Sequence, residues 1–198
     1  MPDENLTKGQ AQGEQEPVEV EDLVARAQGG DLEAIGELYD QHHLSVLKYT
    51  WSKVGDRETA EDLTGEVFLR MVRALPKYRR TKIPFRAWLY RIARNLVIDH
   101  YRMQRDQASV SLEVAENTSN EGDQPAKVVD RALEMEQLHG VLTSIEPSQH
   151  DVVVLRFLVG LSIRETAMAL GKSEASVKAM QHRGLAALRE AFSQQGGR

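Results

Sequence analysis

The stretch KYRRTKIPFRAWLYRIARNLVIDHYRMQR, residues 77–105, has the clearest helical pattern in the chain. From Phe85 onward its apolar residues recur three or four positions apart, which is typical of one buried face of an α-helix. This stripe consists of Phe85, Trp88, Leu89, Ile92, Ala93, Leu96 and Val97. The other face should display Arg86, Tyr90, Arg91, Arg94, Asn95, Tyr101 and Arg102. We therefore expect a helix from Phe85, with Trp88 in its core and a basic face in solvent.

The same stretch has a strong local positive charge. It holds nine basic residues and one acid, Asp99, for a net charge of +8, whereas the whole chain has a net charge of −5. Tyr90 and Tyr101 lie among these basic side chains. Single-stranded or melting nucleic acid binds such a mixture, because cations contact phosphate and flat rings stack on unpaired bases. An ordinary solvated basic helix face is the alternative interpretation.

The charge along the rest of the chain alternates in sign. Residues 1–22 have a net charge of −6 and residues 23–76 a net charge of −3. Residues 106–151 are acidic, with a net charge of −8, and residues 152–198 are basic, with +4. Two basic blocks separated by an acidic spacer indicate two DNA-contacting modules on one tether.

The composition argues against several classes of protein. The chain has no cysteine, so it has no disulfides or thiolate metal sites. Its six histidines are scattered without metal-ligand spacing, and we find no nucleophile paired with a base and no phosphate-binding glycine loop. We expect a non-catalytic protein without cofactor or metal. The acidic N-terminus and the absence of a long apolar run predict a soluble, cytoplasmic protein that does not insert into a membrane.

The predicted fold class is all-α, with two small helical domains joined by a flexible acidic linker. Residues 1–19 resemble a disordered tail, and residues 20–105 form the first domain. Asp31 and Asp56 are candidate N-caps for its helices. Residues 106–130 are predicted to be the linker because Ser, Asn, Gly, Asp and Pro dominate their centre, and residues 131–193 form the second domain.

The second domain has the pattern of a helix-turn-helix. Pro147 begins a mostly apolar helix, and Ser162 with Glu165 matches a capping box at the start of the next. Gly171 permits a turn, and Ser173 can cap the last helix. That helix should direct Val177, Leu185, Leu188 and Phe192 inward, and Lys178, Gln181, His182 and Arg183 outward. This arrangement suits a recognition helix in a major groove, although many helical hairpins bind no DNA.

Three segments in register resemble one protein family. They are FRAWLYRIARN at 85–95, followed by Asp99 and Arg102; AEDLTGEVF at 60–68; and LSIRETAMALGKS at 161–173, followed by Val177 and Lys178. Together they resemble the extracytoplasmic-function group of bacterial sigma factors, in the sigma-70 family, over about residues 20–193. The resemblance implies a protein that binds core RNA polymerase and directs promoter-specific initiation by recognising −35 and −10 elements and trapping the melted non-template strand.

The resemblance also implies three sets of site residues. Residues at the −10 element would be Lys77, Arg79, Arg80, Lys82, Arg86, Tyr90, Arg91, Arg94, Asn95, Tyr101 and Arg102, with the loop 77–84 capturing a flipped base. Residues at the −35 element would be Arg164, Lys172, Ser173, Ser176, Lys178, Gln181, His182 and Arg183. Residues at the polymerase clamp would be Glu61, Asp62, Glu66, Phe68 and Arg70.

Further expectations follow from the resemblance. The partners would be core RNA polymerase, through its clamp and flap regions, promoter DNA and an anti-sigma factor. Arg91 and Ile92 stand where housekeeping relatives have a pair of tryptophans. The resemblance therefore implies a protein that melts promoter DNA less effectively and needs a well-matched promoter. The acidic linker would thread the polymerase cleft as a nucleic-acid mimic, or else serve as a plain tether.

Two alternative functions belong to other classes. An autonomous helix-turn-helix regulator would bind operator DNA without polymerase, but it leaves the basic, aromatic segment 77–105 without a role. A signalling adaptor would use the helices to bind protein only. Failure to bind DNA in any context would favour the adaptor.

Overall fold

The structure is a computed structural model that describes residues 18–80, 82–110 and 138–195. These residues form helices and turns and contain no β-strand, which confirms the all-α prediction. The predicted tail up to residue 17 and the predicted linker from residue 111 lie outside the described residues. Among the helices of the described ranges, none is long and apolar enough to cross a membrane.

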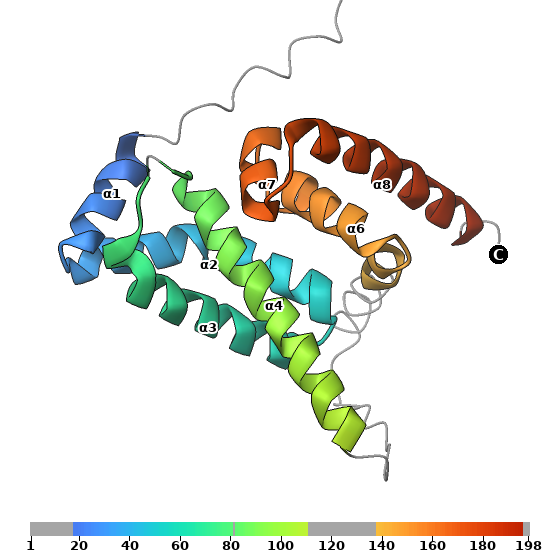
Figure 1. The fold of residues 1–198 in the computed structure, drawn as a ribbon, viewed down its shortest axis with the longest axis horizontal. Helices are drawn as coiled ribbons and strands as arrows, with labels where there is room; N and C mark the ends of the chain where they lie inside the picture. Colours follow the sequence, from blue (N-terminus) through green and yellow to red (C-terminus); the bar gives the residue numbers. More distant parts are fainter. Residues whose placement is uncertain (1–17, 81, 111–137, 196–198) are drawn as a thin grey trace, which may run out of the picture.

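The first domain contains helices α1 to α4. Their bounds are Val18–Gln28 for α1, Leu32–Val54 for α2, Arg57–Ala74 for α3, Leu75–Lys77 for the short 3₁₀ helix η1 and Phe85–Val110 for α4. Helix α2 packs against α1, α3 and α4, and α3 also packs against α4 (Figure 1). The long α4 therefore lies across a base made by α2 and α3.

Aspartate caps set the starts of two of these helices, as the sequence predicts. The Asp31 carboxylate accepts hydrogen bonds from the backbone N–H groups of Glu33 and Ala34, at 3.0 and 3.2 Å. The Asp56 carboxylate accepts one from the N–H of Thr59, at 2.7 Å. Each cap satisfies donors that would otherwise have no partner in the first turn.

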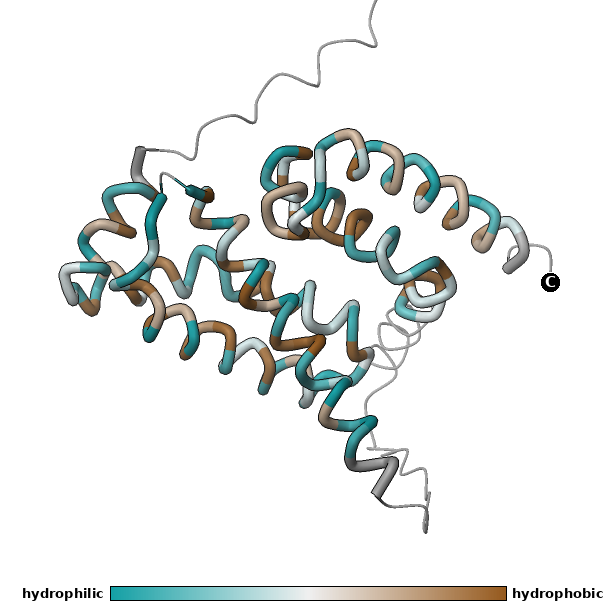
Figure 2. Tube along the Cα trace, viewed as in Figure 1, coloured by the Kyte–Doolittle hydropathy of each residue, from teal (hydrophilic) through white to brown (hydrophobic). Residues whose placement is uncertain are grey.

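The apolar stripe of α4 faces the core of the first domain. Phe85, Leu89 and Ala93 are almost fully buried, and hydrophobic and hydrophilic residues alternate along the helices in Figure 2. Trp88 is half-buried, with its ring 4.6 Å from the ring of Tyr78. It therefore packs against the edge of the core, close to its expected place.

Two predicted boundaries of the first domain differ from the structure. Helix α1 begins at Val18, inside the expected tail, and α4 continues to Val110, five residues into the expected linker. The segment 106–110 has no Gly or Pro to break the helix, so the helix continues to Val110.

The second domain contains residues 138–195. Residues 138–143 are helical; they are followed by α6 (Pro147–Val153), the π-helical turn η2 (Val154–Leu158), α7 (Ile163–Leu170) and α8 (Glu174–Gln195). The predicted capping box is present: the N–H of Ser162 donates to the Glu165 carboxylate at 2.7 Å, and the N–H of Glu165 donates to the Ser162 hydroxyl at 3.1 Å. Gly171 has φ of +64° and makes the turn between α7 and α8.

The inward face predicted for α8 is only partly correct. Val177 is fully buried and Leu188 is half-buried, but Leu185 and Phe192 are exposed. Helix α8 packs mainly on α6, which has seven residues, so the C-terminal half of the 22-residue α8 extends beyond its partner.

The two domains are in contact. Helix α7 lies against the N-terminal half of α4, and η2 packs against α2 (Figure 1). The sequence predicts two modules on a tether, and it contains no sign of this contact.

Candidate nucleic-acid interface

Helix α4 presents part of the expected −10 surface to solvent. Arg91, Asn95, Tyr101 and Arg102 are exposed, and Arg86 and Arg94 are half-buried. The Tyr101 hydroxyl donates to the carbonyl of Lys53 at 2.5 Å, while about half of its side chain stays accessible for stacking. These side chains can contact phosphates, base edges and unstacked bases from one helix.

Tyr90 and Phe68 do not lie where the sequence predicts. Tyr90 is 1% exposed, with its ring 5.7 Å from that of Tyr49, and burial raises the pKa of its hydroxyl to about 12. Phe68 is 6% exposed and packs 4.7 Å from the ring of Tyr39. Both expectations of an exposed contact are wrong, because the core of the first domain wraps further around α3 and α4 than one stripe.

Hydrogen bonds from two side chains, Tyr78 and Gln28, fix the base of the basic loop before α4. The buried Tyr78 hydroxyl donates to the carbonyl of Ile83 at 2.7 Å, and the Gln28 amide donates to the carbonyls of Leu75 and Tyr78. The cations that surround these anchors are exposed: Lys77, Arg79, Arg80 and Lys82. Arg80 also forms an ion pair with Glu21 of α1. The loop thus has a fixed base and a charged rim.

The exposed face of α8 contains most of the expected −35 residues. Lys178, His182 and Arg183 are exposed on it, and the Ser173 hydroxyl caps its first turn by accepting from the N–H of Ser176 at 3.2 Å. The remaining expected positions are half-buried at Ser176 and exposed at Arg164, Lys172 and Ser173.

Gln181 differs from this group. Its side-chain oxygen accepts a hydrogen bond from the Arg156 guanidinium at 3.1 Å, so it is engaged within the domain. The expectation that Gln181 points outward is corrected accordingly.

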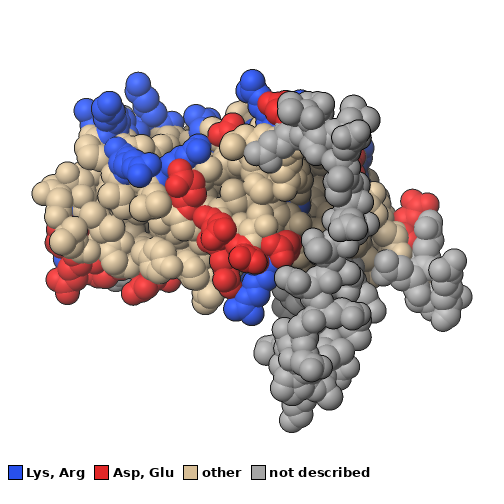
Figure 3. Space-filling model, turned by 90° about the horizontal axis from the view of Figure 1, so that it is seen from below, with Lys and Arg blue, Asp and Glu red and all other residues tan. Residues whose placement is uncertain are grey.

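The outer face of α3 holds the expected clamp residues other than Phe68. Glu61 and Asp62 are exposed, and Glu61 pairs with Arg57 at 2.8 Å. Arg70 pairs with Glu66 at 3.0 Å and reaches Asp99 of α4 at 3.3 Å. On the face that Figure 3 shows, acidic side chains run in a band across the middle, which begins beside the basic side chains of the upper edge.

Leu69 and Val72 are exposed apolar residues on the same helix, and the sequence analysis did not single them out. Their spacing could have indicated them, because they share a helix face with Asp62, outside the buried stripe of Leu63, Val67 and Met71.

The second domain binds three arginines of the expected −10 set. The Arg86 guanidinium donates to the carbonyl of Val159 at 3.1 Å, and that of Arg91 donates to the carbonyl of Met168 at 2.7 Å. Arg94 pairs with the Asp151 carboxylate at 3.2 Å. These contacts run along α4 and join it to α6, to the residue that follows η2, and to α7.

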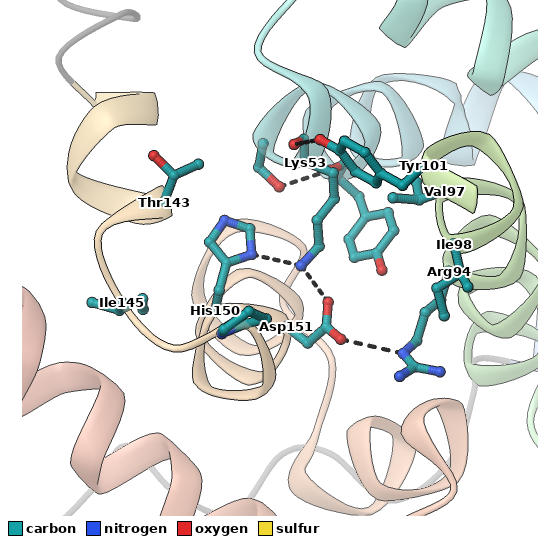
Figure 4. Close-up of a pocket in the computed structure, with 12 residues that line it drawn as sticks. Lys53, Arg94, Val97, Ile98, Tyr101, Thr143, Ile145, His150 and Asp151 are labelled. Atoms are coloured by element: carbon teal, nitrogen blue, oxygen red, sulfur yellow. Dashed lines mark hydrogen bonds and ion pairs between the residues drawn. The ribbon is translucent and has the colours of Figure 1, made fainter. Parts of the chain in front are cut away.

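A buried cluster of charges lies at one end of this contact. Asp151 accepts from both Lys53 and Arg94, and the Lys53 ammonium lies 2.6 Å from Nδ1 of His150 (Figure 4). The side chains of Lys53 and Asp151 are only 12% and 13% exposed. Burial lowers the pKa of Lys53, and the Asp151 carboxylate opposes this effect.

The buried position of His150 keeps its ring uncharged at neutral pH. Burial, followed by the charge of Lys53, lowers the pKa of His150 to about 4. A neutral ring can accept a hydrogen bond from the Lys53 ammonium at Nδ1, which lies 2.6 Å away. The cluster borders a cavity of about 460 Å³ between the domains, which is also lined by Tyr49, Ile98 and Tyr101. Long-range packing creates this site, so no local sequence signal could have found it.

The described residues hold no group of three or more acidic or histidine side chains placed to bind a metal ion. The chemistry that the described side chains offer is cation and amide binding to nucleic acid. It comes from two separate surfaces, on α4 with its preceding loop and on α8.

Comparison with known proteins identifies the family of both domains. The family model for Sigma-70 region 2 matches residues 38–107, and that for Sigma-70 region 4 matches residues 135–188. The chain is 34% identical over 173 residues to the ECF RNA polymerase sigma factor SigD of Mycobacterium tuberculosis, covering 85% of this chain and 81% of that protein. The chain belongs to the ECF RNA polymerase sigma factors.

Two further relatives support the family of this sigma factor. It is 39% identical over 167 residues to the ECF sigma factor BldN of Streptomyces coelicolor, covering 84% of this chain but 63% of that protein. The solved structure of CnrH in complex with the cytosolic domain of CnrY is similar over 87% of this chain and 96% of that chain, at 26% identity and a TM-score of 0.69. The interpretation as an autonomous regulator is therefore not favoured for this sigma factor.

Proposed function

We propose that this sigma factor recognises the −10 element with α4 and the loop 77–84, and the −35 element with α8. The observation that supports this most directly is the exposed row of Arg91, Asn95 and Arg102 on α4, next to a loop with four exposed cations. Asn95 can both donate to and accept from a base edge, whereas the arginines suit phosphate. We place the two domains at residues 20–105 and 131–193, with α4 extending to Val110.

The proposed mechanism follows from how two weak modules act together. Each domain alone binds DNA weakly, and core polymerase would hold both at a fixed separation, so that binding of one raises the effective concentration of the other. The −35 module binds duplex and sets the register. Lys178, His182 and Arg183 enter or border the major groove, where phosphate contacts give affinity and base-edge contacts give sequence preference.

Capture of unpaired bases by the first domain would then favour melting of the promoter duplex. A captured base gains stacking and a pocket, worth about 1–3 kcal/mol per base. Duplex stacking opposes opening at roughly 1.4 kcal/mol per step. A few captured bases are enough to shift a balanced equilibrium, and Tyr101 with the rim of loop 77–84 offers the stacking and charge for that capture.

The proposed partner surface for core polymerase is the outer face of α3. Exposed Glu61 and Asp62 supply charge, and exposed Leu69 and Val72 supply apolar area beside them. Mixed surfaces of this kind combine a desolvated apolar centre with a polar rim. The buried Phe68 would support this face from beneath.

Three further parts of the proposal rest on the family. We assign a non-catalytic role as an initiation subunit, and a cytoplasmic location beside the polymerase. CnrH is solved with the cytosolic domain of CnrY, and we propose that this chain likewise has an anti-sigma factor as a protein inhibitor.

The test of the −10 assignment separates melting from binding. Holoenzyme is formed with the wild type and with Asn95→Ala, and melting is followed by permanganate reactivity of unpaired thymines on a promoter fragment. Closed-complex affinity is measured in parallel by mobility shift at low temperature. We expect Asn95→Ala to reduce melting by more than tenfold and closed binding by less than threefold. Equal loss of both would overturn the assignment.

A further inference from the structure

The cavity between the two domains has the size and the lining of a small-molecule site. Its volume is about 460 Å³, within the range of about 300–1,000 Å³ that is usual for ligand cavities. Val97 and Ile98 of α4 supply apolar surface on one side, and Ile145 of the second domain supplies it on the other (Figure 4). Ligand sites often lie where two domains meet, with a few polar groups on mostly apolar walls.

The polar side of this cavity has more positive than negative charge. Among the residues that line it, Lys53 and Arg94 are cations and Asp151 is the single anion, so the lining has a net charge of +1. His150 adds no charge at neutral pH, because burial and the charge of Lys53 lower its pKa to about 4. The side chains of Lys53 and Asp151 are only 12% and 13% exposed, so water screens the excess charge poorly.

The two cations also keep hydrogen-bond donors to spare. The Lys53 ammonium has three N–H donors, and its contacts are Asp151 and Nδ1 of His150. The Arg94 guanidinium has five, and in the described part of the chain only its Nε has a partner, the Asp151 carboxylate. The remaining N–H groups of an arginine form a planar fork that matches the oxygens of a carboxylate or a phosphate.

Two buried polar groups in the cavity wall lack a hydrogen-bond partner. The hydroxyl of Tyr49 and Nε2 of His150 have none among the described residues, although these side chains are 0% and 4% exposed. Buried polar atoms in folded proteins nearly always have a partner. A bound molecule with hydrogen-bonding groups would supply what this wall lacks.

We propose that this cavity binds a small organic anion, a carboxylate or a phosphate monoester with a short apolar or aromatic body. The anionic group lies against Lys53 and Arg94, and the apolar body lies between Ile98 and Ile145. Because the walls come from both domains, the bound molecule stabilises the contact between them. The site belongs to the free protein and does not depend on the proposed DNA contacts.

Binding is measured on the full free chain, labelled with ¹⁵N, by NMR titration with three probes that share one ring. Benzoate and benzamide have nearly the same shape and differ in charge, and phenyl phosphate distinguishes a phosphate ligand from a carboxylate. We expect both anions to shift the amide signals of Ser52, Lys53 and Thr143 saturably, with dissociation constants of about 1 mM. Benzamide should bind at least tenfold more weakly.

A tethered carboxylate should compete with the probe. Ile98 is 47% exposed and lies one helical turn after Arg94, so Ile98→Glu places an acid beside that guanidinium. Ile98→Gln is the matched control, with the same size and no charge. We expect Ile98→Glu to weaken benzoate binding at least fivefold and Ile98→Gln less than twofold.

The domain contact is followed in the same variants. The sequence has no cysteine, so Asp40→Cys and Ala186→Cys, both exposed, provide the only thiols for a pair of fluorophores. Equal energy transfer in Ile98→Glu and Ile98→Gln shows that both keep the cavity. If energy transfer falls in Ile98→Glu, the same comparison is made from the second domain with Thr143→Glu and Thr143→Gln, because Thr143 is exposed and lines the cavity.

Two results would overturn the site. Equal affinity for benzoate and benzamide would show that the excess charge does not select an anion. Shifts confined to the loop 77–84 and α8 would show that anions bind only the exposed cations proposed for DNA. Neither result touches the proposed function, since Asn95 and Arg183 do not line the cavity.

Discussion

Arg94 Nε lies 3.2 Å from the Asp151 carboxylate, and this pair joins the helix proposed to hold melted DNA to the domain proposed to bind the −35 element. Asn95, the next residue on α4, is exposed. Adjacent residues on a helix point about 100° apart, so one side chain meets the other domain while its neighbour faces solvent. This difference gives the two residues different roles and different expected phenotypes.

Substitution of Arg94 should lower the signal in two separate assays. Arg94→Ala removes a proposed DNA contact, so holoenzyme melting should fall by about tenfold. The same change removes an interdomain ion pair, so energy transfer between the domains of the free chain should also fall. Asn95→Ala should reduce melting and leave the energy transfer unchanged. Identical behaviour of the two variants in both assays would contradict the division of roles.

Substitution of Arg183 should weaken duplex binding at the −35 element. Arg183→Ala removes an exposed cation from α8, and we expect about a 5- to 100-fold loss of affinity for promoter duplex. Salt titration distinguishes the type of contact: loss of a phosphate contact lowers the salt slope by about one for every sequence. Loss of a guanine contact instead relaxes the preference at one base. Arg189→Ala, an exposed cation nearer the C-terminal end of α8, is the control.

A methyl group at Gly184 should destabilise the second domain. A Cβ there would lie 2.8 Å from the Val153 side chain and 3.4 Å from the backbone oxygen of Gln149, so α8 would have to move away from α6. We expect Gly184→Ala to cost about 1–3 kcal/mol of unfolding free energy. Gly36→Ala is the matched control. Nothing lies within 4 Å of that Cβ, and the helical site should gain about 0.5–1 kcal/mol. Equal denaturation midpoints for the two variants would contradict the packing of α6 on α8.

Stability should fall as the pH falls from 6.5 toward 4. Burial lowers the pKa of both His42 and His150 to about 4, helped at His42 by Arg86 and at His150 by Lys53. In this window the unfolded chain binds protons that the folded chain does not, so folding is favoured above pH 6.5 and weakened below it. Each histidine contributes a slope of about 1.4 kcal/mol per pH unit. Urea midpoints at pH 7.5, 6.5 and 5.5 test this, and His42→Gln should reduce the slope. A midpoint that does not change over this range would contradict the buried neutral state.

The local features of the fold were predictable because each depends on residues close in sequence. The caps at Asp31, Asp56 and Ser162 formed as predicted, since a short polar side chain before an apolar run can satisfy the free N–H groups of a first turn. The apolar stripe from Phe85 to Val97 likewise gave α4 and its buried side. The basic loop and the exposed cations of α8 followed from charge alone.

The errors came from contacts between distant parts of the chain. Tyr90 lies beside the apolar stripe, and a tyrosine is equally suited to a core and to a surface, so its burial against Tyr49 on α2 could not be predicted. Asp151 was counted with an acidic spacer, but it lies in α6 and meets Lys53, 98 positions earlier. Ion pairs of this kind leave no periodic pattern, so the closed arrangement of the domains required the structure.

The measurement that tests the sigma-factor account most directly is run-off transcription with core RNA polymerase, with and without this protein, on a pool of genomic promoter fragments. The account predicts transcripts that appear only when the protein is added, from start sites that share two spaced upstream elements. Arg183→Ala should lose transcripts that depend on the −35 element, and Asn95→Ala should reduce all of them. Absence of any new transcript, together with tight sequence-specific DNA binding by the protein alone, would contradict the account.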